Sequence, residues 1–259
     1  MNKKYLLDFA ENDEEKLEFS RMYDLFERCG NKNIQTFTPF LTPAMIVKAQ
    51  KAFSGEENVG FYGGYDEAER KIMSFSPFYK IESDIISDYP IDALKIYTKD
   101  KKVFSHRDYL GSVLSLGIKR EKTGDIIISD TCAYLMCTDD ISEFLIYNFK
   151  KIAHSNIFVE KCEKTCYNFK KQFKEVNFTV SSLRLDAVVS SFTKKSRTQS
   201  ADFIKKGIVN LNYLCETNVS KAVKDGDIIS VKGFGKTVLK TDNLFTRKGR
   251  INITLKIYV

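Results

Sequence analysis

Apolar residues recur with two different periods along this chain, and each period predicts a type of element. Helical spacing over residues 14–30 predicts a first helix, with Gly30 as its stop. Thr42-Pro43 predicts the N-cap and first position of a second helix. We therefore expect residues 1–75 to form a mostly helical N-terminal domain.

The middle of the chain, residues 76–163, has the clearest order of elements. Strands are expected at 91–98, 125–129, 132–137 and 157–160, with helices at 107–116 and after Asp139 or Asp140. The order β-α-β-β-α-β is that of a split ferredoxin-like sandwich, which RNA-recognition modules (RRM) also use. The sequence predicts a ferredoxin-like, RRM-like middle domain.

A polar, lysine-rich connector is expected over 164–179, and a third domain over 180–259. In that domain Ser182 and Ser196 are placed to cap two short helices, and Gly207 to stop the second. Clean alternation over 251–259 predicts a terminal half-buried strand. The fold class expected for the whole chain is α+β.

Charge divides the chain more sharply than its average suggests. The 259 residues carry a net charge of +7 and are 43% hydrophobic, a globular composition. Residues 164–259 hold 19 Lys and Arg against 7 Asp and Glu, a net +12, whereas residues 1–163 hold 22 against 27, a net −5. A basic domain on an acidic body indicates that an anionic partner binds the basic domain.

Other features exclude several classes of protein. The spacing of the six cysteines and two histidines completes no zinc site, so neither a metal nor a cofactor is expected. No apolar run approaches the ~18 residues that span a bilayer. We expect a monomeric cytoplasmic protein with no membrane and no DNA partner.

The second helix of the basic domain begins among cations, which a helix N-terminus disfavours. Lys194, Lys195 and Arg197 surround the Ser196 cap, where the helix dipole already presents positive charge. A phosphate would turn this arrangement favourable by meeting both the cations and the free amides. The alternative to a phosphate site is a lysine run that is merely solvated. Asp186 is interpreted as a structural partner of Arg184 or Arg197.

The candidate RNA-binding residues share positive charge or a place at this helix start. They are Arg184, Lys194, Lys195, Ser196, Arg197, Thr198, Lys205, Lys206, Lys221, Lys232 and Lys236. A possible second contact in the middle domain comprises His106 and Arg107, expected to open a helix that faces the N-terminal domain or RNA, and Lys119 and Arg120, for which a structural surface loop is an equal alternative. No catalytic residue is assigned.

Residues 180–234 resemble the RNA-binding domain first described in ribosomal small-subunit protein four, the S-four domain, with its α-L fold. The matching residues are Arg184-Leu185-Asp186, Ser196-Arg197, Ala201, Ile204-Lys205, Gly207, Val209, Asn212, Gly226-Asp227 and Ile229-Ser230-Val231.

The whole chain also resembles the bacterial YlmH-type proteins, which place such a domain at the C-terminus. The supporting residues are Gly63-Gly64-Tyr65, Ala68-Glu69-Arg70, 106–111, 117–122 and Gly124-Asp125-Ile126. This resemblance implies a ribosome-associated protein that binds large-subunit rRNA and tRNA in the rescue of stalled nascent chains (ribosome-associated quality control), and no catalysis.

Three alternatives were weighed against RNA binding. Residues 233–237 end like a phosphate-binding loop, but Ser230 stands where the first glycine is required. An RNA-modifying enzyme, of the pseudouridine synthase or methyltransferase type, would need a pocket within 60–163 that holds a perturbed carboxylate or a cofactor. A protein-interaction adaptor would leave the +12 domain unexplained.

Overall fold

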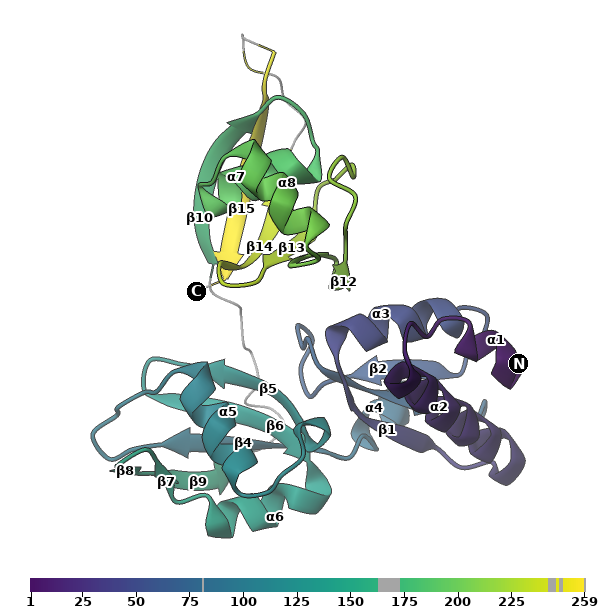
Figure 1. Ribbon diagram of the computed structural model, residues 1–259. Helices are drawn as coiled ribbons and strands as arrows, with labels where there is room; N and C mark the ends of the chain where they lie inside the picture. Colours follow the sequence, from purple (N-terminus) through teal and green to yellow (C-terminus); the bar gives the residue numbers. More distant parts are fainter. Residues whose placement is uncertain (81, 163–172, 242–245, 247–248, 259) are drawn as a thin grey trace. The chain divides into compact units, whose positions relative to one another are not determined.

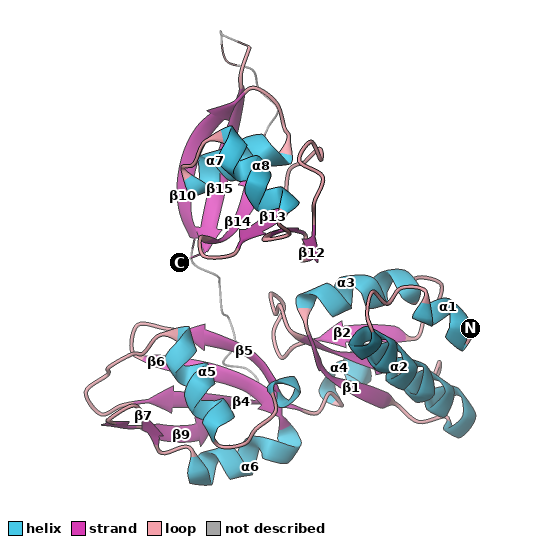
Figure 2. Ribbon diagram, viewed as in Figure 1, coloured by secondary structure: helices cyan, strands magenta, loops and turns pink. Residues whose placement is uncertain are grey.

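The computed structural model describes residues 1–80, 82–162, 173–241, 246 and 249–258. The chain divides into two compact units, Met1–Phe169 and Lys170–Val259. Each unit combines helices with antiparallel sheets, so the chain is of the α+β class (Figures 1 and 2).

The first part of the N-terminal unit packs helices on a small antiparallel sheet. Its helix α2 buries Phe19, Met22 and Cys29, as the apolar spacing predicts, and Asn12 caps its start. Thr42 caps α3 by accepting a hydrogen bond from the Met45 amide, also as predicted. The elements are α1 (Lys3–Leu7), α2 (Asp13–Lys32), β1 (Thr36–Leu41), α3 (Pro43–Ala52), β2 (Val59–Tyr62), β3 (Lys71–Phe75) and α4 (Glu82–Ser87).

Two expectations for this part were wrong. Gly30 lies inside α2, which instead ends at Asn33 in a left-handed conformation. The part is also not mostly helical, because β1, β3 and β2 form a three-stranded sheet in that order. Strand β1 was missed because it contains Pro39 and shifts register between Phe37 and Phe40. Strand β3 was missed because it directly follows a charged stretch, so its short run of buried residues was not recognised as a strand.

The middle part contains one antiparallel sheet of order β5-β6-β4-β9. Helices α5 and α6 cover one face of it (Figure 1), where Leu94, Leu135, Val113 and Leu145 are fully buried in a shared core. Ser105 and Asp108 form a capping box at the start of α5. The elements are β4 (Ile91–Tyr97), α5 (His106–Ser115), η1 (Arg120–Lys122), β5 (Thr123–Ile128), β6 (Cys132–Thr138), α6 (Asp139–Asn148), β7 (Lys151–Ile152), β8 (Ser155–Asn156) and β9 (Phe158–Lys161).

Two details of the middle part differ from the sequence prediction. The N-cap of α6 is Thr138, and both aspartates lie in the first turn, where they favour the helix dipole. A short hairpin, β7 with β8, precedes the last strand and was not expected.

The other face of the middle sheet packs on the three-stranded sheet. Phe40, Ile72 and Tyr89 share a core with Ile91 and Met136. Hydrogen bonds also join the loop between β2 and β3 to β5, because Asp125 accepts from the Tyr65 hydroxyl at 2.8 Å and from the Glu69 amide at 2.6 Å. The Met1–Phe169 unit is therefore one packed body, with a close approach at Gly63.

We expect Gly63→Ala to destabilise this unit by about 1–3 kcal/mol or more. An alanine Cβ there would lie 2.4 Å from the Arg70 carbonyl oxygen and 2.4 Å from the Ala68 Cβ. The Arg70 carbonyl belongs to the backbone, so it cannot turn away from the added methyl group as a flexible side chain could. Thermal unfolding of the full chain measures the change.

The control is Gly111→Ala in α5, where nothing lies within 4 Å, and the helix should gain up to about 1 kcal/mol. Equal unfolding temperatures for the two variants would contradict the packing described.

The C-terminal unit is a six-stranded antiparallel sheet, of order β10-β15-β14-β13-β11-β12, with two helices on one face (Figure 2). Leu185, Val189 and Ile204 of the helices pack against Ile229 and Leu255 of the sheet. The elements are β10 (Phe173–Val180), α7 (Leu185–Thr193), α8 (Arg197–Lys205), β11 (Val209–Leu211), β12 (Leu214–Cys215), β13 (Ile228–Val231), β14 (Gly235–Lys240) and β15 (Ile251–Tyr258).

Two boundaries differ from the sequence prediction. Residues 173–180 form β10, which pairs with β15 along its whole length, whereas a connector was expected through residue 179. The rest of that connector, 164–172, lies outside the described residues. Helix α7 begins after Arg184, so Ser182 is not its cap. In α8 the fully buried positions are Ser200 and Ile204, while Ala201 is half-buried.

Candidate nucleic-acid interface

Helices α7 and α8 meet at a tight basic turn. After Thr193, Lys194 takes a left-handed conformation with φ of 56°, and α8 starts after Ser196. The Ser190 hydroxyl donates to the Lys195 carbonyl at 2.7 Å and ties the turn to α7. A non-glycine residue with positive φ costs about 1 kcal/mol or more, and such strain concentrates at functional sites. Both lysines of the turn are exposed.

A capping box fixes the start of α8. The Gln199 amide donates to the Ser196 hydroxyl at 3.2 Å, and the Ser196 amide donates to the Gln199 side chain at 3.2 Å. The amides of Arg197 and Thr198 have no acceptor within the described part of the chain. The helix start therefore offers two open N–H groups beside exposed cations, which favours an anion. The Ser-x-x-Gln spacing in the sequence is the signal for this box.

Asp186 links the two arginines of the cluster. It accepts from Arg197 Nη2 at 2.8 Å and from Arg184 Nε at 3.1 Å. Burial alone would raise the pKa of Asp186, but the two guanidinium groups outweigh it and hold the pKa below its ordinary value. The carboxylate is 8% exposed, whereas the side chains of Arg184 and Arg197 are 43% and 50% exposed. Asp186 therefore positions both cations without burying them.

We call Arg184, Lys194, Lys195 and Arg197 the α7–α8 cluster. With Asp186 included, its formal charge is +3. Lys221 belongs near it, because the Lys221 carbonyl accepts from the Leu185 amide at 2.9 Å at the start of α7. The Lys221 ammonium lies 3.8 Å from Glu216.

The remaining predicted lysines of this domain lie elsewhere. Lys205 and Lys206 are exposed at the far end of α8, roughly 13 Å along the helix axis from its start at 1.5 Å per residue. Exposed Lys232 lies on the turn that carries Phe234, whose ring contacts Phe203 of α8. The structure thus divides the helix-side lysines between the two ends of α8.

Lys236 is separated from both groups. Its neighbour Thr237 is buried beneath the helices, so the alternation of β14 places Lys236 on the other sheet face. There its ammonium lies 4.2 Å from the centroid of the Tyr258 ring and 5.7 Å from that of Tyr213. The sequence prediction grouped Lys236 with the helix lysines because it did not consider which face of the sheet each residue of β14 would occupy.

The second predicted contact lies around the start of α5 and η1. Arg107 and Lys119 are exposed. Desolvation of the imidazole, and next the Arg120 cation, lower the pKa of His106 below its ordinary value. Arg120 Nη1 donates to the Thr123 carbonyl at 2.7 Å and to the Gly124 carbonyl at 3.1 Å. Arg120 therefore stabilises the turn into β5, and its RNA contact stays a prediction.

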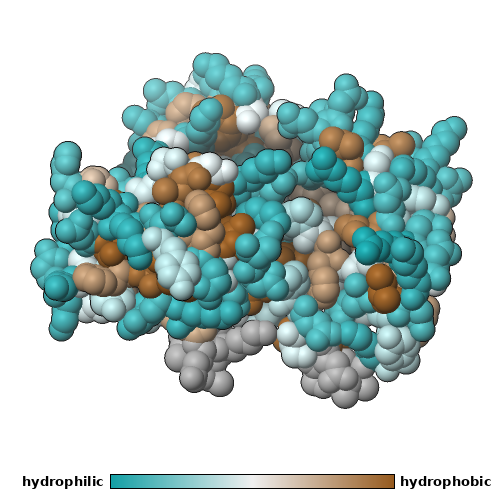
Figure 3. Space-filling view, turned by 90° about the horizontal axis from the view of Figure 1, so that it is seen from below, coloured by the Kyte–Doolittle hydropathy of each residue, from teal (hydrophilic) through white to brown (hydrophobic). Residues whose placement is uncertain are grey.

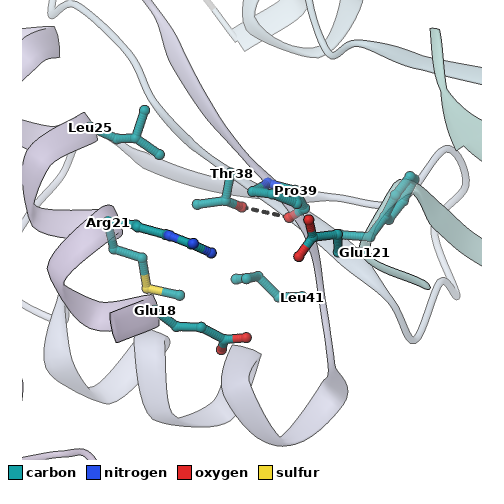
Figure 4. Close-up of a pocket in the computed structure, with 9 residues that line it drawn as sticks. Glu18, Arg21, Leu25, Thr38, Pro39, Leu41 and Glu121 are labelled. Atoms are coloured by element: carbon teal, nitrogen blue, oxygen red, sulfur yellow. Dashed lines mark hydrogen bonds between the residues drawn. The ribbon is translucent and has the colours of Figure 1, made fainter. Parts of the chain in front are cut away.

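Two adjoining hollows lie where η1 meets α2 and β1. The smaller, about 40 Å³, is lined by Glu18, Arg21, Thr38, Leu41 and Glu121 among others, with Arg21 beside the Thr38–Pro39 hydrogen bond in Figure 4. The larger, about 370 Å³, adds Arg70, Lys119 and Arg120 to Glu18 and Arg21.

Two arginines that line the larger hollow, Arg70 and Arg120, are held by backbone carbonyls. Arg70, 8% exposed, donates to the carbonyls of Thr123 and Phe40 at 3.0 and 2.9 Å. Burial, and next the Arg120 charge, lower the pKa of Arg70 to about 10. Burial and the Glu15 charge raise the pKa of Glu18. Sequence reasoning missed Arg70 and Glu18, whose partners are distant in sequence.

The surface offers few other signs of a ligand. On the face drawn in Figure 3, hydrophobic side chains form small patches among hydrophilic ones. Within the described ranges, no group of three or more His, Cys, Asp and Glu side chains could hold a metal ion. None of the helices described has both the length and the apolar composition to cross a membrane.

Comparisons with known proteins give one consistent result. Residues 86–166 match a family model described as "Putative RNA-binding domain in YlmH". The chain is 34% identical, over 85% of its length and 86% of the relative, to "Ribosome-associated protein quality control protein P2" of Bacillus subtilis (strain 168). A solved structure, "Cell division protein ylmH from Streptococcus pneumoniae", is 17% identical, with a TM-score of 0.50 over 60% of this chain and 95% of that one. The last likeness shows the fold alone.

Proposed function

This chain belongs to the YlmH family, and we propose that it is a non-enzymatic, monomeric RNA-binding protein of the ribosome. Its target would be structured rRNA or tRNA, and its role the rescue of stalled nascent chains on the large subunit. The relative named for ribosome-associated quality control supports the ribosomal part of the proposal. The RNA-binding description of the family model supports the ligand class.

The observation that carries the proposal is the α7–α8 cluster beside two open amides. A phosphate placed at the start of α8 would meet the Arg197 and Thr198 amides, the exposed lysines of the turn and the positive end of the helix dipole. Phosphate contacts position a protein on RNA without reading its sequence. Specificity would then follow from RNA shape, which suits a folded rRNA or tRNA target.

The modular division is part of the same proposal. The C-terminal unit would be an S-four domain, and residues 76–163 a ferredoxin-like, RRM-like domain behind an N-terminal domain of residues 1–75. The sheet order β5-β6-β4-β9, with α5 and α6 on one face, supports the second assignment. Lys205, Lys206, Lys221, Lys232, Lys236, His106, Arg107, Lys119 and Arg120 would give further contacts outside the cluster.

Crosslinking the chain to RNA in cells and sequencing the attached fragments tests this function. We expect fragments of large-subunit rRNA and of tRNA, because structured RNA is the proposed ligand. Fragments spread over messenger RNA with no ribosomal enrichment would contradict the proposal.

Incubating RNA with the purified chain tests the enzymatic alternative. An active site was expected within 60–163, and the larger hollow has Arg70, Lys119 and Arg120 from that range. Its carboxylate of raised pKa, Glu18, comes from α2, outside the range. Mass spectrometry of nucleosides from RNA incubated with the chain should show no change under the proposed function. A modified nucleoside would establish an enzyme instead.

A further inference from the structure

The middle sheet carries an aromatic pair on the face opposite α5 and α6. Tyr97 of β4 and Phe158 of β9 are cross-strand partners. Their ring centroids lie 5.5 Å apart and their planes differ by 25°, so the rings are stacked. Leu94 and Ile96 of the same strand are buried in the core under α5 and α6. Strand alternation therefore places the Tyr97–Phe158 pair on the other face.

Two lysines flank the rings. The Lys95 ammonium lies 5.2 Å from the centroid of the Tyr97 ring, and the Lys99 ammonium 5.6 Å from that of Phe158. Lys95 also pairs with Glu160 at 3.2 Å, and the Tyr97 hydroxyl donates to the same carboxylate at 3.4 Å. The Tyr97 ring is thus packed against Phe158 and Lys95, and its hydroxyl is held by Glu160. Phe158 is 40% exposed, a large apolar side chain left in water.

Within the described residues, the core shared with the N-terminal part reaches this sheet face mainly at one end. It includes Ile91, Ala93 and Met136, with partly buried Ile127 and Cys162 packed against it. Tyr97 lies four residues beyond Ala93, roughly 13 Å along the strand at 3.2–3.4 Å per residue. Tyr134, the partner of Lys95 on β6, faces the same side. Aromatic rings and lysines therefore gather at the Tyr97–Phe158 end of this sheet face, where Phe158 is exposed.

We propose that this end of the sheet is a second RNA site, one that stacks unpaired bases on Tyr97 and Phe158. The inference rests on the proposed RNA-binding function but uses none of the α7–α8 cluster. A base would stack on an aromatic face, where Lys95 and Lys99 now lie, and these cations would turn to the flanking phosphates. Bases inside a duplex are already stacked and paired, so the ligand is single-stranded RNA.

A tryptophan reporter tests the site directly, since the chain has no tryptophan. In Phe158→Trp, a short oligouridylate should quench the fluorescence in a saturable way, because a stacked base contacts the indole. An RNA duplex of equal length should quench it much less. The matched control is Tyr147→Trp on α6, where Tyr147 is 70% exposed and no quenching is expected.

Affinity gives a second measurement. Tyr97→Leu with Phe158→Leu keeps apolar volume and should weaken oligouridylate binding about tenfold or more, without changing far-UV circular dichroism. Phe144→Leu with Tyr147→Leu, exposed aromatics of α6, should bind as the unmodified chain does.

The outcomes separate the two proposals. Unquenched Phe158→Trp together with unchanged affinity in Tyr97→Leu/Phe158→Leu would overturn the stacking site, whether or not structured RNA still binds. If the chain binds neither oligouridylate nor structured RNA, the proposed function fails as well. Quenching by duplex and single strand alike would also overturn the inference, because it would show that unpaired bases are not required.

Discussion

Replacing Lys194 and Lys195 with glutamine should weaken binding to structured RNA and flatten its dependence on salt. Each phosphate contact contributes roughly 0.7–0.9 to the slope of log affinity against log salt. Losing two contacts should therefore lower the slope by about 1.4–1.8. Arg197 is left in place because it pairs with buried Asp186, so the variant removes charge from the turn without breaking that pair.

Fluorescence anisotropy with an rRNA or tRNA hairpin, measured over a range of salt concentrations, gives both quantities. The matched control is Lys32→Gln with Lys51→Gln, two exposed lysines of the N-terminal part, which makes the same change in net charge. If both variants lose affinity equally, the turn has no special role. If only the control retains the original slope, the phosphate site lies at the α7–α8 cluster.

Asp186→Asn should destabilise the C-terminal unit near neutral pH, by about 1–2 kcal/mol. Hydrogen bonds to charged groups contribute about 1.5–3 kcal/mol, and we reduce that range because both guanidinium groups are half in water. The folded-state pKa of Asp186 lies below its ordinary value of 3.8. The stabilisation is therefore complete above pH 3.8 and is lost as pH falls through the lower, folded-state pKa.

The stability difference between Asp186→Asn and the unmodified chain should consequently shrink in acid. Calorimetry of the full chain at several pH values, with hydrogen exchange of the α7 amides to report the C-terminal unit, measures it. Asp202→Asn, on the exposed side of α8, serves as the control and should change little. A difference that stays constant down to pH 2 would show that the charge of Asp186 does not carry the effect.

The sequence predicted those elements whose local patterns agree with their final surroundings. Helix α5 and the strands of the middle sheet have clear periodicity, and α5 also has a capping box. Ser196 caps α8 as expected. Strand β10 was missed because Lys174 and Glu175 hide the half-buried Val176 and Phe178. In α8, fully buried Ser200 gives no apolar signal.

The candidate site was predictable as a set of cations around the Ser196 cap, with Asp186 as the partner of Arg184 or Arg197. That Asp186 reaches both Arg184 and Arg197 follows from helix packing, which the sequence suggests without fixing. The position of Lys236 depends on the alternation of β14 and on Tyr258, the last described residue of the final strand. Tyr97 and Phe158 lie 61 residues apart in sequence and become neighbours only through the register of β4 with β9.

The order of strands in the C-terminal sheet has a consequence for synthesis. Strand β15 lies between β10 and β14, and its Thr254 bonds to Asn177, which is 77 residues earlier. During translation β10 therefore waits, with its hydrogen-bonding edge unmatched, until β15 emerges. A product that ends before Ile251 would lack this interior strand, so the edges of β10 and β14 that β15 joins would have no strand to pair with.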